Sequence, residues 1–408
     1  MIERVLDAID RSAIEELVVN KVPESKTLEY KQALPGFSDA DKKEFLADIT
    51  SFANASGGDI IYGIKAEVDE SGKKTGLPES VLPIAEASAD EVKLRLEEIT
   101  RNGTDPRVKV HPAAVRGWGD EGQSFVLVVR IPRSFSSPHV VKYGGSFRFY
   151  SRNSAGKYPL DVAELRSAFL ATDYHADRIR RFREDRLARI VADETPMPLT
   201  TRDRLVLHMV PLSALSDGVR LDMPTQTMAA NDFRPLAAQG WNHRLNFEGL
   251  LTSRPGDEPT GAVYAYCQLF LNGAVEAVQS DLLVHHNAEE SNAKTSFLPS
   301  RAYEQDLIHG VQRYMSGLKA LGVLPPIALF VSLLGCRGAY LGLSHRRFAI
   351  GNGYPIDRDA LVLPDVSAED FDVDIPGLLK PVFDAVWKTC GFPGSLDYDD
   401  EGNWKSGQ

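Results

Sequence analysis

The sequence has few cysteines and no long apolar run. Its three cysteines, Cys267, Cys336 and Cys390, are far apart and odd in number, so neither a disulfide framework nor a zinc cluster is expected. The longest apolar stretch, residues 322–335, contains two prolines and is shorter than the ~18 residues that a membrane span requires. These absences argue against a disulfide-rich secreted protein and against a membrane protein.

A complete phosphate-binding loop is also missing. The stretch "SGKKTG" at 71–76 ends like a Walker loop, but Glu67 stands where the first glycine of that loop is needed. Gly57 and Gly58 would allow a phosphate to approach closely, although a glycine pair more often ends a helix. Binding of ATP is therefore kept only as a second alternative.

The composition is typical of a globular protein in a reducing compartment. The chain has 408 residues, of which 43% are hydrophobic and 25% charged, and this length predicts two domains. Residues 1–17 carry a charge every few positions, unlike a secretory signal. We therefore expect a cytoplasmic location and no membrane partner.

A basic block lies inside this acidic protein. The formal net charge is −11, yet residues 107–190 contain 16 Lys and Arg against 8 Asp and Glu. The local charge of a surface matters more than the net charge when a polyanion binds. The block therefore indicates nucleic acid as a partner.

The pattern of helices and strands predicts an α+β fold. Residues 38–55 begin with Ser38 as a candidate N-cap and Asp41 three residues later, and apolar residues then recur at helical spacing. A short apolar run after Gly58 predicts a buried strand. Between residues 107 and 152 the pattern changes to strands separated by turns.

These patterns also give expected boundaries. Residues 1–172 are predicted to form an α+β domain with a mixed sheet and flanking helices, and residues 173–199 a helical linker with an apolar stripe. Residues 200–395 are predicted to form a second α+β domain, and residues 396–408 a loose acidic tail. The elements expected in the second domain are strands at 205–210, 263–271 and 327–334, and helices near 301–321 and 378–388.

The stretch "ESKTLEYK" at 24–31 places two carboxylates five residues apart around a short strand. Side chains at an odd spacing in a strand point to opposite faces, so Glu24 and Glu29 can share a site only if the chain bends near Ser25. On the residues alone, two separate surface charges remain the alternative.

Four motifs together resemble a known family. They are "ESKTLEYK", "EFLADITSFANASGGDIIYGI", "IPRSFSSPHVV" and "FRFYSRNSAGK", and over about residues 15–172 the chain resembles the AlbA-type domain of the Schlafen family. Members that cut transfer RNA and ribosomal RNA hold a divalent metal with two glutamates and an aspartate. The resemblance implies that these glutamates are Glu24 and Glu29, and that the lysine after them is Lys31.

The third acid of the family is absent from its usual place. Lys65 and Ala66 stand where the nucleases carry the aspartate, and Glu67 or Asp69 is the nearest replacement. The resemblance thus implies Mg²⁺ or Mn²⁺ held by Glu24, Glu29 and Glu67, with Glu24, Glu29 and Lys31 as catalytic residues. It also implies a homodimer.

Basic and aromatic side chains alternate in "SFRFYSR". The face with Arg148, Tyr150 and Arg152 is expected to contact phosphates and to stack a base, while Phe147 and Phe149 take the other face. A solvated face that carries cations for solubility is the alternative. The expected nucleic-acid contacts are Arg130, Arg133, His139, Lys142, Arg148, Tyr150 and Arg152.

Three functions follow from these observations. The first is nucleic-acid binding with metal-dependent endoribonuclease cleavage of structured RNA such as transfer RNA, with RNA favoured over DNA. The second, favoured by Ala66, is a non-catalytic DNA-binding or regulatory module, for example in phage defence. The third is the nucleotide-binding domain already considered.

Overall fold

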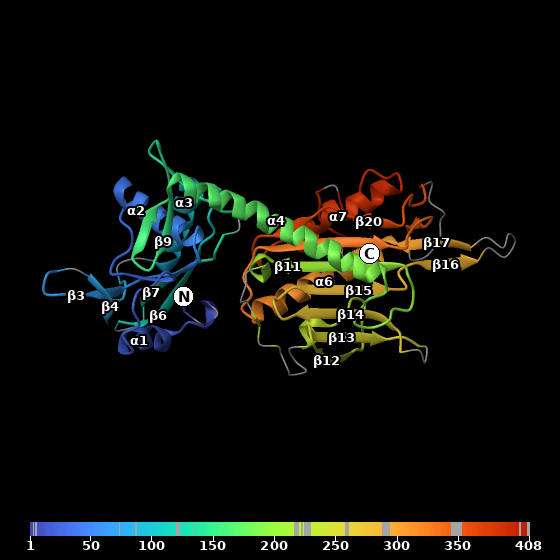
Figure 1. Ribbon diagram of the computed structural model, residues 1–408, viewed down its shortest axis with the longest axis horizontal. Coiled ribbons are helices and arrows are strands. Elements are labelled where there is room, and N and C mark those ends of the chain that lie inside the picture. The colour runs from blue at the N-terminus through green and yellow to red at the C-terminus, as the bar shows by residue number, and fades with distance from the viewer. Residues whose placement is uncertain are drawn as a thin grey trace. The chain divides into compact units, whose positions relative to one another are not determined.

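The computed structural model divides into two compact units, residues 1–176 and 177–408 (Figure 1). The structure describes residues 1–2, 4, 6–72, 74–85, 88–119, 123–134, 136–215, 220–221, 223, 230–257, 261–287, 294–343, 353–399 and 401–405. Helix α4 (Val162–Val191) begins in the first unit and ends in the second. Both units combine helices and sheets, which confirms the predicted α+β fold.

The first unit contains two four-stranded sheets and a separate hairpin. The first sheet has the order β1-β2-β7-β6, in which only β1 and β2 are parallel. The second has the order β10-β9-β8-β5 and is antiparallel, and β3 pairs with β4 alone. The elements are α1 (Arg11–Val19), β1 (Leu28–Lys31), α2 (Asp39–Ala53), β2 (Gly58–Tyr62), β3 (Ile64–Val68), β4 (Lys74–Val81), α3 (Ala89–Gly103), β5 (Thr104–Asp105), β6 (His111–Trp118), β7 (Ser124–Ile131), β8 (Val140–Tyr143), β9 (Ser146–Asn153) and β10 (Gly156–Pro159).

Helix α2 joins the two sheets of the first unit. Ser38 and Asp41 form the predicted capping box at its start, which satisfies backbone N–H groups that would otherwise lack partners. Phe45, Ile49 and Phe52 pack in one core with residues of β2, β7 and β8. Helix α1 covers the opposite face of the first sheet, so that sheet is buried on both sides.

The second unit is built on one large antiparallel sheet with the order β12-β13-β14-β15-β11-β18-β20, and β21 also pairs with β18. A small sheet has the order β16-β17-β19. The elements are β11 (Arg204–Pro211), β12 (Asn242–Asn246), β13 (Gly249–Pro255), β14 (Val263–Phe270), β15 (Val275–Ser280), β16 (Val284–Asn287), β17 (Lys294–Pro299), α6 (Ser300–Ala320), β18 (Ile327–Leu334), β19 (Tyr340–Gly342), β20 (Ala360–Val362), β21 (Val366–Ala368) and α7 (Ile375–Thr389).

Helices cover both faces of the large sheet. Helices α6 and α7 pack on one face in the main core, and the second half of α4 packs on the other through Ile179, Phe182, Leu187 and Ile190. This confirms that the apolar stripe of the linker helix packs on a neighbour. β11, β14, β18, α6 and α7 also lie at the positions predicted for them, within a few residues. Over the described residues, no helix is long and apolar enough to cross a membrane.

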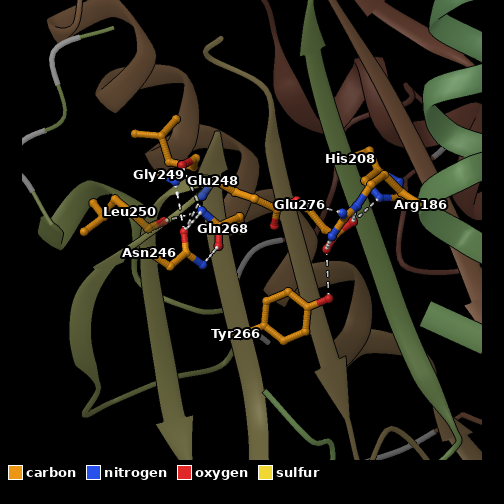
Figure 2. A network of polar contacts seen from close by, with 10 residues as sticks. Arg186, His208, Asn246, Glu248, Gly249, Leu250, Tyr266, Gln268 and Glu276 are labelled. Carbon is orange, nitrogen blue, oxygen red and sulfur yellow. Dashed lines mark hydrogen bonds and ion pairs between the residues drawn. The ribbon is translucent and has the colours of Figure 1, made fainter. Parts of the chain in front are cut away.

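A buried ionic network fixes α4 to this sheet (Figure 2). Arg186 on α4 donates two hydrogen bonds to Glu276 on β15, both 2.7 Å long. His208 Nε2 and the Tyr266 hydroxyl also contact the Glu276 carboxylate, each at 2.9 Å. Burial would raise the pKa of Glu276, but Arg186 and His208 lower it to about 2. We call these four residues the Glu276 network.

All three cysteines lie in the main core of the second unit. Cys267, Cys336 and Cys390 are buried among α6, α7 and the large sheet. Burial raises the pKa of the Cys267 and Cys336 thiols to about 12 and that of Cys390 to about 11. The thiolate is the reactive form, so these side chains are protected by both position and protonation.

The sequence predicts a loose tail at residues 396–408, but two aromatic side chains among its described residues, 396–399 and 401–405, are bound to the rest of the second unit. Tyr398 is buried and donates a hydrogen bond to the Pro376 carbonyl. Trp404 Nε1 donates to the Glu304 carboxylate at 3.2 Å. Trp387 and Ser395 donate to the same carboxylate, at 2.8 and 2.9 Å. A polar, acidic composition does not reveal such contacts, because they depend on two aromatic side chains and on acceptors elsewhere in the chain, the Pro376 carbonyl and the Glu304 carboxylate.

Replacing Glu304 by glutamine is expected to change how stability depends on pH. Burial, and next the nearby Asp397 charge, raise the pKa of Glu304 from 4.5 to about 7, against the lowering effect of its hydrogen-bond donors. The folded state then holds a proton that the unfolded state releases, so this group's contribution to stability falls as pH rises from 4.5 to 7. The loss is about 3 kcal/mol, since one pKa unit corresponds to about 1.4 kcal/mol.

Urea unfolding of wild type and Glu304→Gln across this pH range measures the difference between the two slopes. Glu184→Gln, on the exposed face of α4, is the matched control and should keep the wild-type slope. Equal slopes for wild type and Glu304→Gln would contradict the assignment.

Candidate functional site

The chain bends just after Glu24. Ser25 and Leu28 exchange backbone hydrogen bonds of 2.9 and 3.3 Å and so close a tight turn. Beyond the turn, the Tyr30 N–H donates to Glu24 Oε1 at 2.9 Å. Burial raises the pKa of Glu24, and the Glu29 charge adds to the rise. The bend required near Ser25 is therefore present, and the two carboxylates are close enough to influence each other.

Glu29 belongs to a row of alternating charges, which we call the Lys31 network. Glu29 binds Arg152 at 2.9 Å and Lys31 at 2.8 Å. Lys31 also binds Asp48 at 3.0 Å. Asp48 binds Lys157 at 2.6 Å, and Lys157 binds Glu44 at 2.5 Å. In order, the network is Arg152, Glu29, Lys31, Asp48, Lys157 and Glu44, and it connects β9, β1, α2 and β10.

These contacts keep the network ionised around Glu29. Burial would raise the pKa of Glu29, but Lys31 and Arg152 hold it below its usual value. Burial would lower the pKa of Lys31, but Asp48 and Glu29 raise it. Burial, and next the Glu29 charge, raise the pKa of Asp48, while Lys31 and Lys157 oppose that rise.

Asp48 and Lys157 are absent from the residues proposed on sequence. Asp48 is 2% exposed on α2 and lies on the helix face of Phe45 and Phe52. An acid on the apolar face of a predicted helix is a usable signal, because a buried charge needs a partner. The identity of that partner is not a local property, since Lys157 is 109 residues away.

The three expected metal ligands do not form one site. Glu67 lies on the β3–β4 hairpin with its carboxylate 3.7 Å from Lys21. Both oxygens of Glu29 are held by cations, and one oxygen of Glu24 accepts the Tyr30 N–H. Among the described residues, no group of three Asp, Glu, His or Cys side chains could hold an ion. These residues therefore do not fit a resident divalent metal.

Arg130, expected to contact nucleic acid, has a structural position. It is 5% exposed near the end of β7. It binds the buried Asp59 through two hydrogen bonds, of 2.8 and 3.0 Å. Two further N–H groups donate to the carbonyls of Ile2 and Arg4. The guanidinium thus donates four hydrogen bonds inside the first unit, which corrects the expectation of a phosphate contact.

His139 is also buried, at 1% exposure. Its Nδ1 lies 2.6 Å from the Pro106 carbonyl, and burial lowers the pKa of the ring. Asn54, from the "FANASGG" motif, accepts a hydrogen bond from the His139 N–H and donates to the carbonyls of His139 and Tyr150. The histidine and the motif asparagine therefore hold β8 and β9 against the end of α2.

The motif glycines have a packing role. Gly57 has φ +70°, and a Cβ there would lie 2.5 Å from the Arg133 backbone nitrogen. A Cβ on Gly58 would lie 2.5 Å from the Thr27 carbonyl oxygen. The Gly57 N–H donates to the Phe52 carbonyl at the helix end. The pair thus lets α2 end close to neighbouring backbone, the more common of the two interpretations of this motif.

Strand β9 turns the opposite way from the expected one. Tyr150 packs against the core at α2, and Arg152 is buried with its guanidinium 3.6 Å from the centre of the Phe52 ring. Phe147 points to the other face and is 65% exposed. Alternation shows which residues share a face but not which face is solvated. This reversal corrects the expected contacts of Tyr150 and Arg152.

An exposed basic and aromatic surface remains at the β8–β9 turn. Lys142 lies directly opposite Phe147 in the pairing of the two strands, and both are exposed, as is Arg148. Lys43 on α2 reaches the same turn, with its Nζ 3.1 Å from a Cβ built on Gly144. We call Lys43, Lys142, Phe147 and Arg148 the hairpin patch. Arg133, the remaining expected contact, is exposed in the loop after β7.

Comparison with known proteins agrees with the resemblance of the first unit. Residues 24–161 match the family model described as Schlafen, AlbA_2. No curated protein matches the chain.

Two solved structures are similar over part of the chain. The DIP2311 protein from Corynebacterium diphtheriae has 16% identity and a TM-score of 0.24, covering 37% of this chain and 26% of that one. The N-terminal domain of an ATP-dependent DNA helicase RecG-related protein from Nitrosomonas europaea has 20% identity and a TM-score of 0.21, covering 28% and 68%. This chain thus spans about a quarter of the first structure.

Proposed function

We propose that this protein binds single-stranded nucleic acid through the hairpin patch, since residues 24–161 match the Schlafen, AlbA_2 family model and that family supports a nucleic-acid-associated function. The observation that carries the proposal is an exposed aromatic ring on a turn that also bears exposed cations. Phe147 is 65% exposed and shares its face of the hairpin with Lys142, its partner in the strand pairing. Arg148 and Lys43 lie at the same turn on the face toward α2.

The cations of the patch are available to a ligand. In the described part of the chain, neither Lys142 nor Arg148 has a side-chain hydrogen bond or ion pair. By contrast, Arg130, Arg152 and Lys157 are all paired with carboxylates. Phosphates bind free cations more strongly, because no internal ion pair has to break first.

The aromatic ring favours a single strand over a duplex. Stacking on a side chain needs a base that is not already stacked within a helix, and one such contact contributes ~1–3 kcal/mol. We further propose RNA rather than DNA as the ligand, in line with the family resemblance. The 2′-hydroxyl is the group by which a protein distinguishes the two.

Fluorescence anisotropy with a labelled single-stranded RNA, and with DNA of the same sequence, tests this proposal. Phe147→Ala is expected to weaken binding ~5- to 160-fold, which corresponds to the loss of one stacked base. The pair Lys142→Ala and Arg148→Ala should reduce the slope of log K against log [salt] by about 1.4, since each single-strand phosphate contact contributes ~0.7.

Arg116→Ala is the matched control, because Arg116 is an exposed arginine on β6 outside the patch. It should leave the affinity nearly unchanged. If Arg116→Ala and Arg148→Ala lower the affinity for RNA equally, binding depends on general charge attraction and not on the hairpin patch. Equal affinity for RNA and DNA would remove the RNA preference and leave the patch in place.

Metal-dependent cleavage of structured RNA is the competing function. The paired state of Glu29 supports binding without cleavage. We therefore expect transfer RNA and single-stranded RNA to remain intact with the protein and Mg²⁺ or Mn²⁺. If the protein cleaves RNA and the cleavage disappears in Glu24→Ala and in Glu29→Ala, the protein is a metal-dependent endoribonuclease and the proposal of binding without cleavage is wrong.

A further inference from the structure

Two lysines of the Lys31 network each bridge two carboxylates from different elements. Lys31 Nζ contacts Glu29 on β1 and Asp48 on α2, at 2.8 and 3.0 Å. Lys157 Nζ contacts Asp48 and Glu44, at 2.6 and 2.5 Å. Asp48 is therefore held from both sides, and each ammonium occupies a gap between two acids.

Each of these gaps has the donor chemistry of a hard-cation site. Carboxylate oxygens are the preferred ligands of Mg²⁺ and Mn²⁺. In both gaps such oxygens converge on one positive centre within about 3 Å. Metal–oxygen bonds measure ~2.0–2.6 Å, so a small inward movement of the carboxylates would suit a metal ion in place of either ammonium.

The charges of the network already balance. Arg152, Lys31 and Lys157 supply three positive charges, and Glu29, Asp48 and Glu44 supply three negative ones. A divalent ion added to this row would meet three resident cations at short range. If a lysine charge is removed, a divalent ion can enter the gap that the ammonium leaves without displacing a cation there.

We propose that Lys31 and Lys157 are built-in counter-ions that stand where a divalent cation would otherwise hold Glu29, Asp48 and Glu44 together. The first unit keeps β1, α2, β9 and β10 in place without metal. Removing a lysine charge turns its gap into a cation site made of two carboxylates. This inference is independent of the proposed nucleic-acid binding, since it concerns only the contacts inside the network.

The test compares thermal unfolding of wild type, Lys31→Met and Lys157→Met at pH 8 with increasing MnCl₂. Methionine keeps the apolar stem and removes the charge. Without metal both variants should unfold at a lower temperature than wild type, because like charges then face each other across the gap. With Mn²⁺ at about five times its Kd, each should regain about 3 °C, while wild type should not respond.

Two further measurements keep the result specific. Electron paramagnetic resonance of free Mn²⁺ should show loss of the aqueous signal with either variant and not with wild type. Lys26→Met, at an exposed lysine outside both the network and the hairpin patch, is the matched control and should show the Mn²⁺ response of wild type. Adding Glu29→Gln to Lys31→Met should abolish its Mn²⁺ response, because one of the two carboxylates is then lost.

The opposite results would overturn the proposal. One is an Mn²⁺ response of wild type that Glu29→Gln removes, since this would place a metal in the native network. The other is no response from either variant. If Lys31→Met does not fold, Lys157→Met decides the outcome. The Glu44 side chain at its gap is 62% exposed, so solvent can hydrate that carboxylate when the lysine charge is lost.

Discussion

Glu276→Gln is expected to lower the free energy of unfolding of the second unit by about 3–5 kcal/mol, the usual cost of removing one partner from a buried ion pair. The carboxylate is 0% exposed and receives hydrogen bonds from Arg186, His208 and Tyr266 (Figure 2). A neutral amide leaves the buried Arg186 charge with only the more distant, partly exposed Glu248 carboxylate as a counter-ion. It also presents an NH₂ group to side chains that are themselves donors.

Urea unfolding monitored by thiol labelling measures this effect in the second unit alone, because all three cysteines lie in its core. Glu248→Gln is the matched control. Its carboxylate is 33% exposed and contacts Arg186 at 3.4 Å, so we expect a change below about 1 kcal/mol. A similar small change in Glu276→Gln would show that the Glu276 network does not hold α4 on the sheet.

The stabilisation from Glu276 should also depend on pH. The pKa of the Glu276 carboxyl, about 2, lies below the ordinary 4.5, so the unfolded state binds the proton more tightly than the folded state does. The stabilisation is therefore complete above pH 4.5 and is lost as pH falls from 4.5 to 2. Glu276→Gln should remove this dependence together with the stability.

Arg130→Met is expected to destabilise the first unit by about 3–5 kcal/mol, for the same reason. Asp59, at 0% exposure, would lose the only cation that contacts it among the described residues, and the carbonyls of Ile2 and Arg4 would lose their donors. If Arg130 instead contacted a phosphate, its replacement would weaken nucleic-acid binding and leave stability nearly unchanged.

Arg148→Ala provides the contrasting variant. Arg148 is exposed at the start of β9, so its loss should weaken binding with little effect on unfolding. Hydrogen–deuterium exchange of the β7 peptide in urea follows the first unit, because β7 lies in its core. A stability loss in Arg148→Ala as large as that in Arg130→Met would contradict the division between surface and interior cations.

Local sequence patterns were sufficient for most of the fold. Ser38 and Asp41 marked the start of α2, and continuous apolar runs marked β11, β14 and β18. The same kind of run contains Arg130, in "SFVLVVRIP". A strand that is apolar on both faces is buried on both faces, so the sequence did carry a signal that this arginine is internal.

The candidate site was less accessible to such patterns. A bend near Ser25 was the condition for Glu24 and Glu29 to share a site, and the structure has this bend. The partners of Glu29 were not predictable in this way, because Arg152 lies 123 residues further along the chain. Alternation in β9 fixed which side chains share a face, but the choice of face depends on distant acids, namely Glu29 on β1 for Arg152 and Asp48 on α2 for the neighbouring Lys157.

The position of the cysteines has a practical consequence for studying the hairpin patch. The native thiols are enclosed and protonated, and none belongs to residues 1–176. A cysteine introduced at Ser154, exposed on the turn between β9 and β10, would be the one readily conjugated position in the folded protein. A fluorophore or a photocrosslinker attached there could report on bound RNA without any replacement of the natural cysteines.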